Sequence, residues 1–251
     1  QYEPAAKVFQ KLVETGVAGR RLAADAAHMR ALSLRQAGQL PESAEAYESA
    51  LRQFQREKKA SDLSPEEQQV VLVAFQCAKG LARVRKELMQ TEPADQAYAV
   101  AVEQLELLPK NQQQELDQLL HEWALLHYNL QNYDRADQLF TTLIAKRPES
   151  PLADDARLYV GESHFFAQRW KQAQEVFAAI DKDPAADDFV RQRALVLSLD
   201  AAWEQKDWPV LIAAARKLLQ KFPQSEQRGY AEYRLGEGLV QTGQSKEAVD
   251  V

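Results

Sequence analysis

Cysteine, glycine, proline and long apolar runs are all scarce in this chain of 251 residues. Its one cysteine, Cys77, excludes an internal disulfide and any zinc site built from several cysteines. The longest uninterrupted apolar runs, among them Val70 to Phe75, have six residues, far short of the roughly 20 residues of a membrane-spanning helix. The sequence therefore predicts no membrane insertion, and its 45% hydrophobic residues are enough for an ordinary globular core.

Positive charge is scarce as well. Residues 1–125 hold 15 basic and 18 acidic side chains and residues 126–251 hold 16 and 19, so each half carries −3 of the total −6. Neither half offers the basic surface that nucleic acid needs. The basic run Lys79–Lys86 lacks stacking aromatics, and we interpret it as a solvated helix face. No nucleic-acid partner is expected.

Apolar residues recur at steps of three and four, as in Leu119-Leu120-Trp123-Leu126-Leu130, and nowhere alternate as they do in strands. Only nine glycines and ten prolines interrupt them. We therefore expect an all-α protein without strands. The chain begins at Gln1 without Met and stops inside a helical pattern at Val251, and we expect it to be a piece of a longer protein.

A period runs through the second half of the chain. A small or apolar residue in each copy falls at 136, 173, 211 and 248, so the spacings are 37, 38 and 37. Such a period predicts stacked helical hairpins, because one amphipathic hairpin cannot bury its apolar face alone. The copies are Tyr133-Ala136-Phe140, Trp170-Ala173-Phe177, Trp208-Leu211-Ala215 and Ser245-Ala248.

Fainter copies lie upstream, at Ala5-Phe9, at Leu40-Ser43-Tyr47 and at Ala94-Tyr98. Their spacing is irregular, since 43 to 94 is 51 residues and 94 to 136 is 42. We expect one solenoid over 1–251, with degenerate repeats in 1–113 and regular repeats of 37–38 residues in 114–251. About six hairpins, with partial units at both ends, account for the length.

Local chemistry marks the helix boundaries. Ser64-Pro65-Glu66-Glu67 is a capping box with proline at the first helical position. We expect Ser150-Pro151 and Asp183-Pro184 to start helices in the same way. Turns between helices are predicted at Gly38, Gly243, Gln131-Asn132 and Lys206-Asp207.

One helix of each hairpin carries Leu-Gly or Val-Gly (Leu235-Gly236, Val160-Gly161), and the next carries Ala-x-x-x-Phe with a trailing proline (Ala136, Phe140, Pro148). This alternation resembles the tetratricopeptide repeat. The resemblance is good over 114–251 and weaker over 1–113, and it implies a right-handed superhelical α-solenoid that binds other proteins. Positions that carry Trp and Tyr in the family carry Arg157, Glu232, His127, His164 and Leu239 here.

The linkers narrow the resemblance. Lys146–Pro151 and Lys221–Glu226 each precede a helix with a Gly-Glu pair, at Gly161-Glu162 and Gly236-Glu237. This combination of a linker and a following Gly-Glu helix resembles the repeats of bacterial cell-envelope proteins, such as the Tol-Pal-associated coordinator and the outer-membrane assembly lipoprotein. The resemblance implies a periplasmic or envelope location, with a cytoplasmic one left open.

The sequence contains no complete catalytic or metal-binding motif. His121-Glu122-Trp123-Ala124-Leu125 begins like a zinc-protease helix but has leucine where the second ligand must stand. Gly161–Phe165 lacks the second glycine of a nucleophile elbow, and no glycine-rich phosphate loop exists. We expect neither an enzyme nor a metal, and no cofactor.

Two single-residue features have plain structural interpretations. His127 and His164 are 37 residues apart in adjacent repeats, and we favour hydrogen-bonded core-edge histidines over a shared ligand site. Cys77 lies between Phe75 and Ala78 and is interpreted as a small buried hydrophobe.

The remaining chemistry is recognition. The resemblance implies that the first helix of each hairpin lines a concave groove, with aromatic residues in register with acids there. The aromatics would anchor a partner side chain, and the acids would favour a basic partner. The alternative for the rings is core packing. The predicted groove residues are Tyr128, Tyr159, Glu162, Phe165, Phe166, Asp200, Trp203, Tyr233 and Glu237.

We therefore predict a non-enzymatic protein-interaction module that holds a peptide or partner domain, as part of a larger envelope-associated bacterial protein. One alternative is an architectural spacer or self-association segment without a ligand. Another is an accessory segment of a multidomain enzyme or transcription regulator. The oligomeric state and the identity of the partner are left open by the sequence.

Overall fold

The computed structural model describes residues 2–14, 19–56 and 63–249 of the chain. These residues form helices joined by short turns and contain no strand, as the apolar period predicts. The α-helices are α1 (Tyr2–Glu14), α2 (Arg20–Gln36), α3 (Leu40–Phe54), α4 (Pro65–Glu87), α5 (Thr91–Glu106), α6 (Leu116–Asn129), α7 (Tyr133–Lys146), α8 (Ala153–Phe166), α9 (Trp170–Lys182), α10 (Asp188–Glu204), α11 (Trp208–Lys221), α12 (Arg228–Gln241) and α13 (Ser245–Ala248).

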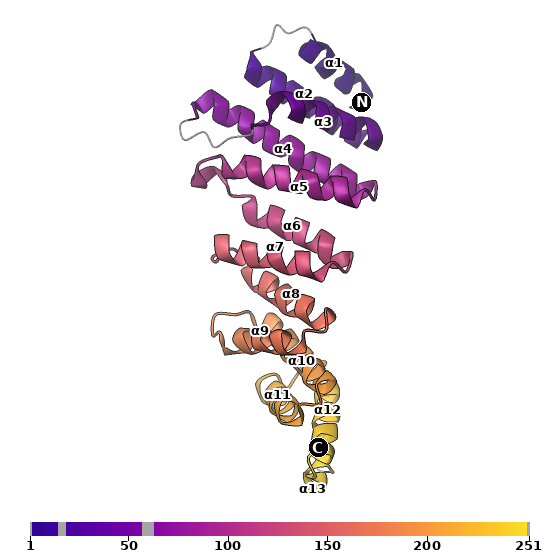
Figure 1. Ribbon diagram of the computed structural model, residues 1–251, viewed down its shortest axis with the longest axis vertical. Coiled ribbons are helices and arrows are strands. Elements are labelled where there is room, and N and C mark those ends of the chain that lie inside the picture. Colours follow the sequence, from indigo (N-terminus) through magenta and orange to yellow (C-terminus); the bar gives the residue numbers. More distant parts are fainter. Residues whose placement is uncertain (1, 15–18, 57–62, 250–251) are drawn as a thin grey trace. The chain divides into compact units, whose positions relative to one another are not determined.

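The chain divides into two compact units, Gln1–Leu119 and Leu120–Val251. In unit 1 each helix packs on the next, from α1 to α5 (Figure 1). In unit 2 the same holds from α7 to α13, and α10 also contacts α8 and α12 (Figure 1). We call the first helix of each hairpin helix A (α2, α4, α6, α8, α10, α12) and the second helix B (α3, α5, α7, α9, α11, α13). The single array over 1–251 stays a prediction.

A left-handed residue closes each hairpin. Its amide donates to the carbonyl three residues back, and the next amide donates to the carbonyl five residues back, which satisfies the last carbonyls of helix A. The sequence identified most of these turns, although non-glycine residues occupy four of them. The residues are Gly38, Met89, Gln131, Gln168, Lys206 and Gly243, with φ of 78°, 59°, 60°, 61°, 55° and 77°.

Helix starts follow the sequence in one case and depart from it in two. The capping box at α4 is confirmed, since the Ser64 hydroxyl accepts from the Glu67 amide and the Glu67 carboxylate accepts from the Ser64 amide. These bonds, with one from Arg56, lower the pKa of Glu67 to about 2. The helix starts predicted at Ser150-Pro151 and Asp183-Pro184 are wrong. Both side chains close turns instead, by accepting from the amides of Leu152 and Ala185.

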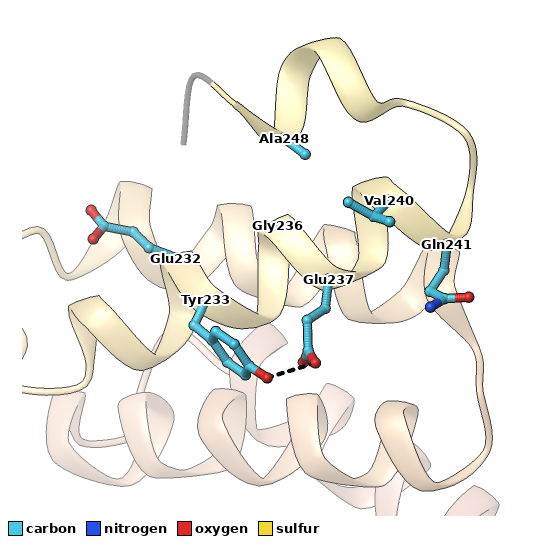
Figure 2. Close-up of a pocket in the computed structure, with 7 residues that line it drawn as sticks. All are labelled: Glu232, Tyr233, Gly236, Glu237, Val240, Gln241 and Ala248. Carbon is cyan, nitrogen blue, oxygen red and sulfur yellow. Dashed lines mark hydrogen bonds between the residues drawn. The ribbon is translucent and has the colours of Figure 1, made fainter.

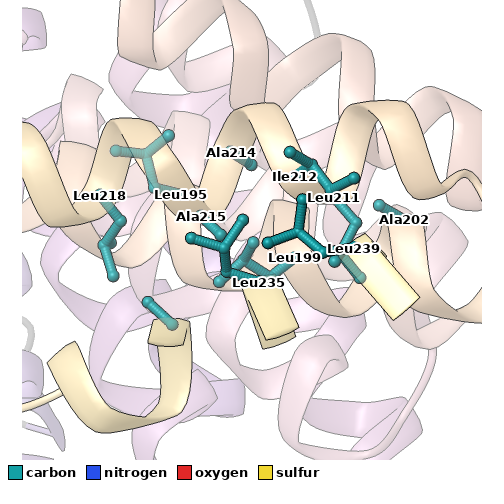
Figure 3. Close-up of a cluster of buried hydrophobic side chains, with 11 residues drawn as sticks. Leu195, Leu199, Ala202, Leu211, Ile212, Ala214, Ala215, Leu218, Leu235 and Leu239 are labelled. Carbon is teal, nitrogen blue, oxygen red and sulfur yellow. The ribbon is translucent and has the colours of Figure 1, made fainter. Parts of the chain in front are cut away.

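The core of unit 2 is built from the predicted apolar positions. One cluster joins helices α10, α11 and α12, with Leu199, Leu211 and Leu239 fully buried at its centre (Figure 3). A second cluster joins α8, α9 and α10 around Phe177 and Ile180. Consecutive hairpins therefore share apolar residues, as a repeat array requires.

The two glycines of the Leu-Gly motif meet different surroundings. A Cβ on Gly161 would lie 2.3 Å from Cε1 of Phe177, so the glycine is what lets α8 and α9 approach. A Cβ on Gly236, 75 residues later at the equivalent position, would meet nothing within 4 Å. The glycine of the motif is therefore required for packing in the α8–α9 hairpin, whereas beside α12 it borders open space.

We expect alanine substitutions at these glycines to have opposite effects. Gly161→Ala should lower the free energy of unfolding by about 1–3 kcal/mol, because the buried ring of Phe177 has to move. Gly236→Ala should raise it by about 1 kcal/mol, because alanine favours the helix and clashes with nothing. Urea denaturation followed by circular dichroism measures both, and a similar loss in the two variants would contradict the close approach.

The probes of the two units are separate, because Cys77 lies in unit 1 while Trp123, Trp170, Trp203 and Trp208 lie in unit 2. Cys77 is 1% exposed, and burial raises the pKa of its thiol to about 12. Its thiol should react with a disulfide reagent at pH 8 only after unfolding.

If the helices are stabilised by their nearest neighbours, Gly161→Ala should change the unfolding midpoints reported by the tryptophans and by Cys77 to different extents. The urea midpoint seen by tryptophan fluorescence should fall more than the midpoint seen by Cys77 labelling. Equal shifts would mean that both units unfold as one cooperative body and would contradict this prediction.

Candidate partner-binding surface

An aromatic pair recurs at the turn of three successive hairpins in unit 2. The last turn of helix A supplies one ring, and the first residue of helix B supplies the other. The pairs are Tyr128 with Tyr133, Phe165 with Trp170, and Trp203 with Trp208, and all three meet edge to face with centroids 5.8, 4.9 and 5.4 Å apart. Such pairs contribute about 0.5–1.5 kcal/mol beyond their buried area. The predicted groove rings Tyr128, Phe165 and Trp203 thus also brace their own hairpins.

Around the first of these pairs the rings become continuous. Phe166 stacks on Tyr133 at 5.6 Å and touches Phe165 at 5.3 Å, while Tyr128 contacts Tyr159 at 4.9 Å. We call these five residues the ring cluster. Phe166 is 47% exposed, whereas the other four are half-buried. The ring cluster therefore exposes the ring of Phe166 to solvent, while the four half-buried rings support it from below.

Glu162 lies beneath the ring cluster and is only 2% exposed. Its Oε2 accepts from the Tyr128 hydroxyl at 2.7 Å, and its Oε1 accepts from Nε of Arg193 at 2.8 Å. These bonds join three successive A helices, α6, α8 and α10. Burial, followed by the bond to Glu162, raises the pKa of Tyr128. The carboxylate is thus compensated inside the protein, because a buried charge needs a partner.

The next repeats use the same arrangement with other residues. Asp200 of α10 accepts from the Tyr230 hydroxyl and lies 3.7 Å from Nη2 of Arg234, both on α12. Arg234 also binds Glu237 at 3.1 Å and stacks over Trp203 at 4.4 Å. Burial raises the pKa of Asp200 despite these partners. Each acid that the sequence placed in register with the rings therefore has a cation beside it.

A pocket of about 500 Å³ opens beside Gly236, where Phe177 fills the equivalent space of the earlier hairpin (Figure 2). Tyr233 crosses one side of it and donates to Glu237 at 2.7 Å, as Figure 2 shows. Tyr233 is 60% exposed. The lining residues are Glu232, Tyr233, Gly236, Glu237, Val240, Gln241 and Ala248.

The predicted groove residues fall into three groups. Tyr128, Tyr159, Glu162, Phe165 and Phe166 lie together in or under the ring cluster, and Asp200, Trp203 and Glu237 gather around Arg234. Tyr233 lines the pocket on α12. Phe165 and Trp203 also pack against the two core clusters, which supports the packing alternative for these two rings.

Three contributors were missed by the sequence reasoning. Tyr133 was used only to define a copy of the repeat, although its place five residues after Tyr128 could have paired the two rings. Arg193 and Arg234 are not among the predicted groove residues, although Arg234 directly follows Tyr233. Their role follows only from the contact between neighbouring A helices.

The histidines have hydrogen-bond partners, as predicted. Nδ1 of His127 lies 3.3 Å from Nδ2 of the Asn132 side chain, and Nδ1 of His164 accepts from Nε of Arg169 at 3.0 Å. In both hairpins the partner lies five residues later, at the start of helix B. No group of three His, Cys, Asp or Glu side chains within the described residues is arranged to hold a metal ion. Of the helices described, none is both long and apolar enough to cross a bilayer.

Residues 121–188 match the family model for the tetratricopeptide repeat. Among solved structures, a chain of Naa15/Naa10 bound to HypK-THB is 15% identical with a TM-score of 0.67, and the alignment covers 100% of this chain and 33% of that one. The apo form of RapI is 12% identical with a TM-score of 0.58 over 99% of this chain and 67% of that one. YrrB, a tetratricopeptide protein with an unusual peptide-binding site, is 15% identical with a TM-score of 0.52, over 91% and 99%.

No curated protein matches the sequence. The chain spans about a third of the length of the Naa15/Naa10 complex chain that it resembles. The matches support the tetratricopeptide repeat assignment, and the predicted all-α solenoid of helical hairpins is confirmed. At these identities the structures show the fold alone, so the handedness of the superhelix and the envelope subtype stay predictions.

Tyr128→Phe should remove the Glu162 bond and lower the free energy of unfolding by about 1–2 kcal/mol at pH 8. The difference in free energy of unfolding between wild type and Tyr128→Phe should become smaller above pH 10. There the unfolded wild-type chain loses a tyrosine proton that the folded protein retains, so wild-type stability falls as pH rises. Urea titrations at pH 8 and 10.5 measure this difference.

Tyr133→Phe is the matched control, because it removes a hydroxyl from the same ring cluster without touching Glu162. A difference that stays constant with pH, or equal losses in the two variants, would contradict the assigned role of Tyr128.

Proposed function

We propose that unit 2 binds a peptide segment of a partner protein on the surface formed by its A helices, centred on Phe166. The tetratricopeptide fold is that of a protein–protein interaction scaffold, and the family is generally a non-enzymatic interaction module. The observation that carries the proposal is the exposed ring of Phe166, stacked on Tyr133 within the ring cluster. A large apolar side chain held half in solvent is a binding anchor when its neighbours fix it in place.

The surface around Phe166 is held in place before a ligand arrives. Tyr128 and Arg193 both bind the buried Glu162, so the rings and the guanidinium have fixed positions. Preorganisation of this kind strengthens binding, since less side-chain freedom is lost on association. An extended peptide along α6, α8 and α10 would find an apolar anchor flanked by hydrogen-bonding groups.

The proposal includes the finer predictions of the sequence. The partner is expected to be basic, and the chain is expected to act without catalysis as part of a larger, envelope-associated bacterial protein. The linker phrases support the envelope context by resemblance. The YrrB structure, described by its peptide-binding site, supports peptide binding as a use of this fold. An architectural spacer is the competing function.

Selection of peptides from a displayed random library on the purified chain tests the proposal. Selected peptides should bind Phe166→Ser roughly tenfold more weakly than wild type, because burial of part of an aromatic side chain is lost. Titration calorimetry measures the two dissociation constants. The melting temperature of Phe166→Ser should stay within a few degrees of wild type, since the ring is half exposed.

Val8→Ser is the matched control, because Val8 is 66% exposed on α1 in unit 1. It should leave the affinity unchanged. A selection that enriches no peptide, or peptides that bind Phe166→Ser as well as wild type, would reject this surface and favour the spacer.

A further inference from the structure

A second cleft, of about 610 Å³, lies between α10 and the segment that leads into α12. This volume is within the range of about 300–1,000 Å³ that is usual for small-ligand sites. Arg193 connects the cleft to the ring cluster, because its Nε binds Glu162 while its side chain lines the cleft. The lining residues are Phe189, Gln192, Arg193, Val196, Leu197, Asp200, Glu226 and Gln227.

The apolar part of the cleft is firmly supported. Val196 packs against the core cluster of α10 to α12, and Leu197 packs against that of α8 to α10. Phe189 stands at the first turn of α10 with 69% of its surface exposed. An aliphatic chain of three or four carbons would thus contact two side chains backed by the core, Val196 and Leu197, and the exposed ring of Phe189.

The charges around the cleft leave a deficit of cations. Arg193 pairs with Glu162, Arg234 lies beside both Asp200 and Glu237, and Glu226 is the fourth carboxylate of this region. Within the described part of the chain Glu226 forms no ion pair. The neighbouring Arg191 and Arg228 are bound along their own helices to Asp188 and Glu232.

Asp200 is a half-buried carboxylate of the cleft that a further cation would stabilise in its charged form. Burial raises its pKa above the ordinary aspartate value, and the nearby Glu204 adds to this effect. Tyr230 and Arg234 oppose the shift without reversing it. A desolvated carboxylate with a deficit of positive charge is complementary to a basic group.

We infer that this cleft binds an arginine or lysine side chain of the partner segment, with the aliphatic stem on Val196 and Leu197 and the cation between Asp200 and Glu226. The ring of Phe189 adds a cation–π contact at the rim. The inference rests on the proposed function, since it names the kind of residue that a peptide on this surface carries next to its apolar anchor.

Titration of the isotope-labelled chain with acetyl-arginine N-methylamide, followed by NMR, tests the cleft without any partner. Saturable shifts should appear at the amides of Gln192, Val196, Leu197 and Gln227. Acetyl-citrulline N-methylamide has the same shape without the charge and should bind at least about fivefold more weakly. Equal binding of the two compounds, or shifts elsewhere only, would overturn the inference.

Glu226→Gln should weaken arginine binding about fivefold, and its fold should be unaffected because the side chain is exposed. Asp200→Asn should weaken it further, because the carboxylate charge is lost while Oδ1 can still accept from Tyr230, and its melting curve shows whether the fold is disturbed. Glu175→Gln, the same change at an exposed site on α9, should bind as wild type. Unchanged binding in Glu226→Gln would overturn the assignment of the cation site.

The two proposals fail separately. Peptides that depend on Phe166, together with equal binding of arginine and citrulline, would overturn the cleft inference alone. Arginine binding in the cleft, together with no Phe166-dependent peptide, would support the cleft and overturn the proposed anchor.

Discussion

The close approach of helices α8 and α9 is the constraint on which the surrounding part of unit 2 depends. Gly161 permits it at α8, where the ring of Phe177 occupies the position of a missing Cβ. A left-handed turn residue such as Gln168 reverses the chain within three residues. Because helix A and helix B then have a fixed register, the last turn of one always faces the first residue of the other. The recurring aromatic pairs follow from that register.

Paired charges connect neighbouring hairpins, whereas the contact at Gly161 connects the two helices of one hairpin. Glu162 on α8 accepts from a residue of α6 and from a residue of α10, and both partners of Asp200 lie on α12. A buried carboxylate is costly unless it is paired, so each acid selects the register of its neighbours. The same groups leave Arg193 and Phe166 at the surface in defined positions. The candidate binding surface is therefore a product of how the repeats are joined.

The repeat pattern predicted the fold closely because its signals are local. The pairs Ala136-Phe140 and Ala173-Phe177 and the capping box at Ser64 each join residues a few positions apart, and the structure follows them. The helix starts predicted at Ser150 and Asp183 were wrong because a Ser-Pro or Asp-Pro pair can stabilise a turn as well as cap a helix. The contacts of Arg193 with Glu162 and of Arg234 with Asp200 could not be predicted, since each joins two helices across about 30 residues of sequence.

The rings of unit 2 show why core and surface are hard to separate in a repeat array. Phe165 and Trp203 stand at positions that could face a ligand, yet each packs on a core cluster and on the first aromatic of its helix B. Phe166, one residue further, is turned toward solvent and still leans on Tyr133. In a helix a step of one residue rotates a side chain by about 100°. Recognition therefore depends on residues beside the repeat motif, and the motif itself determines how firmly they are held.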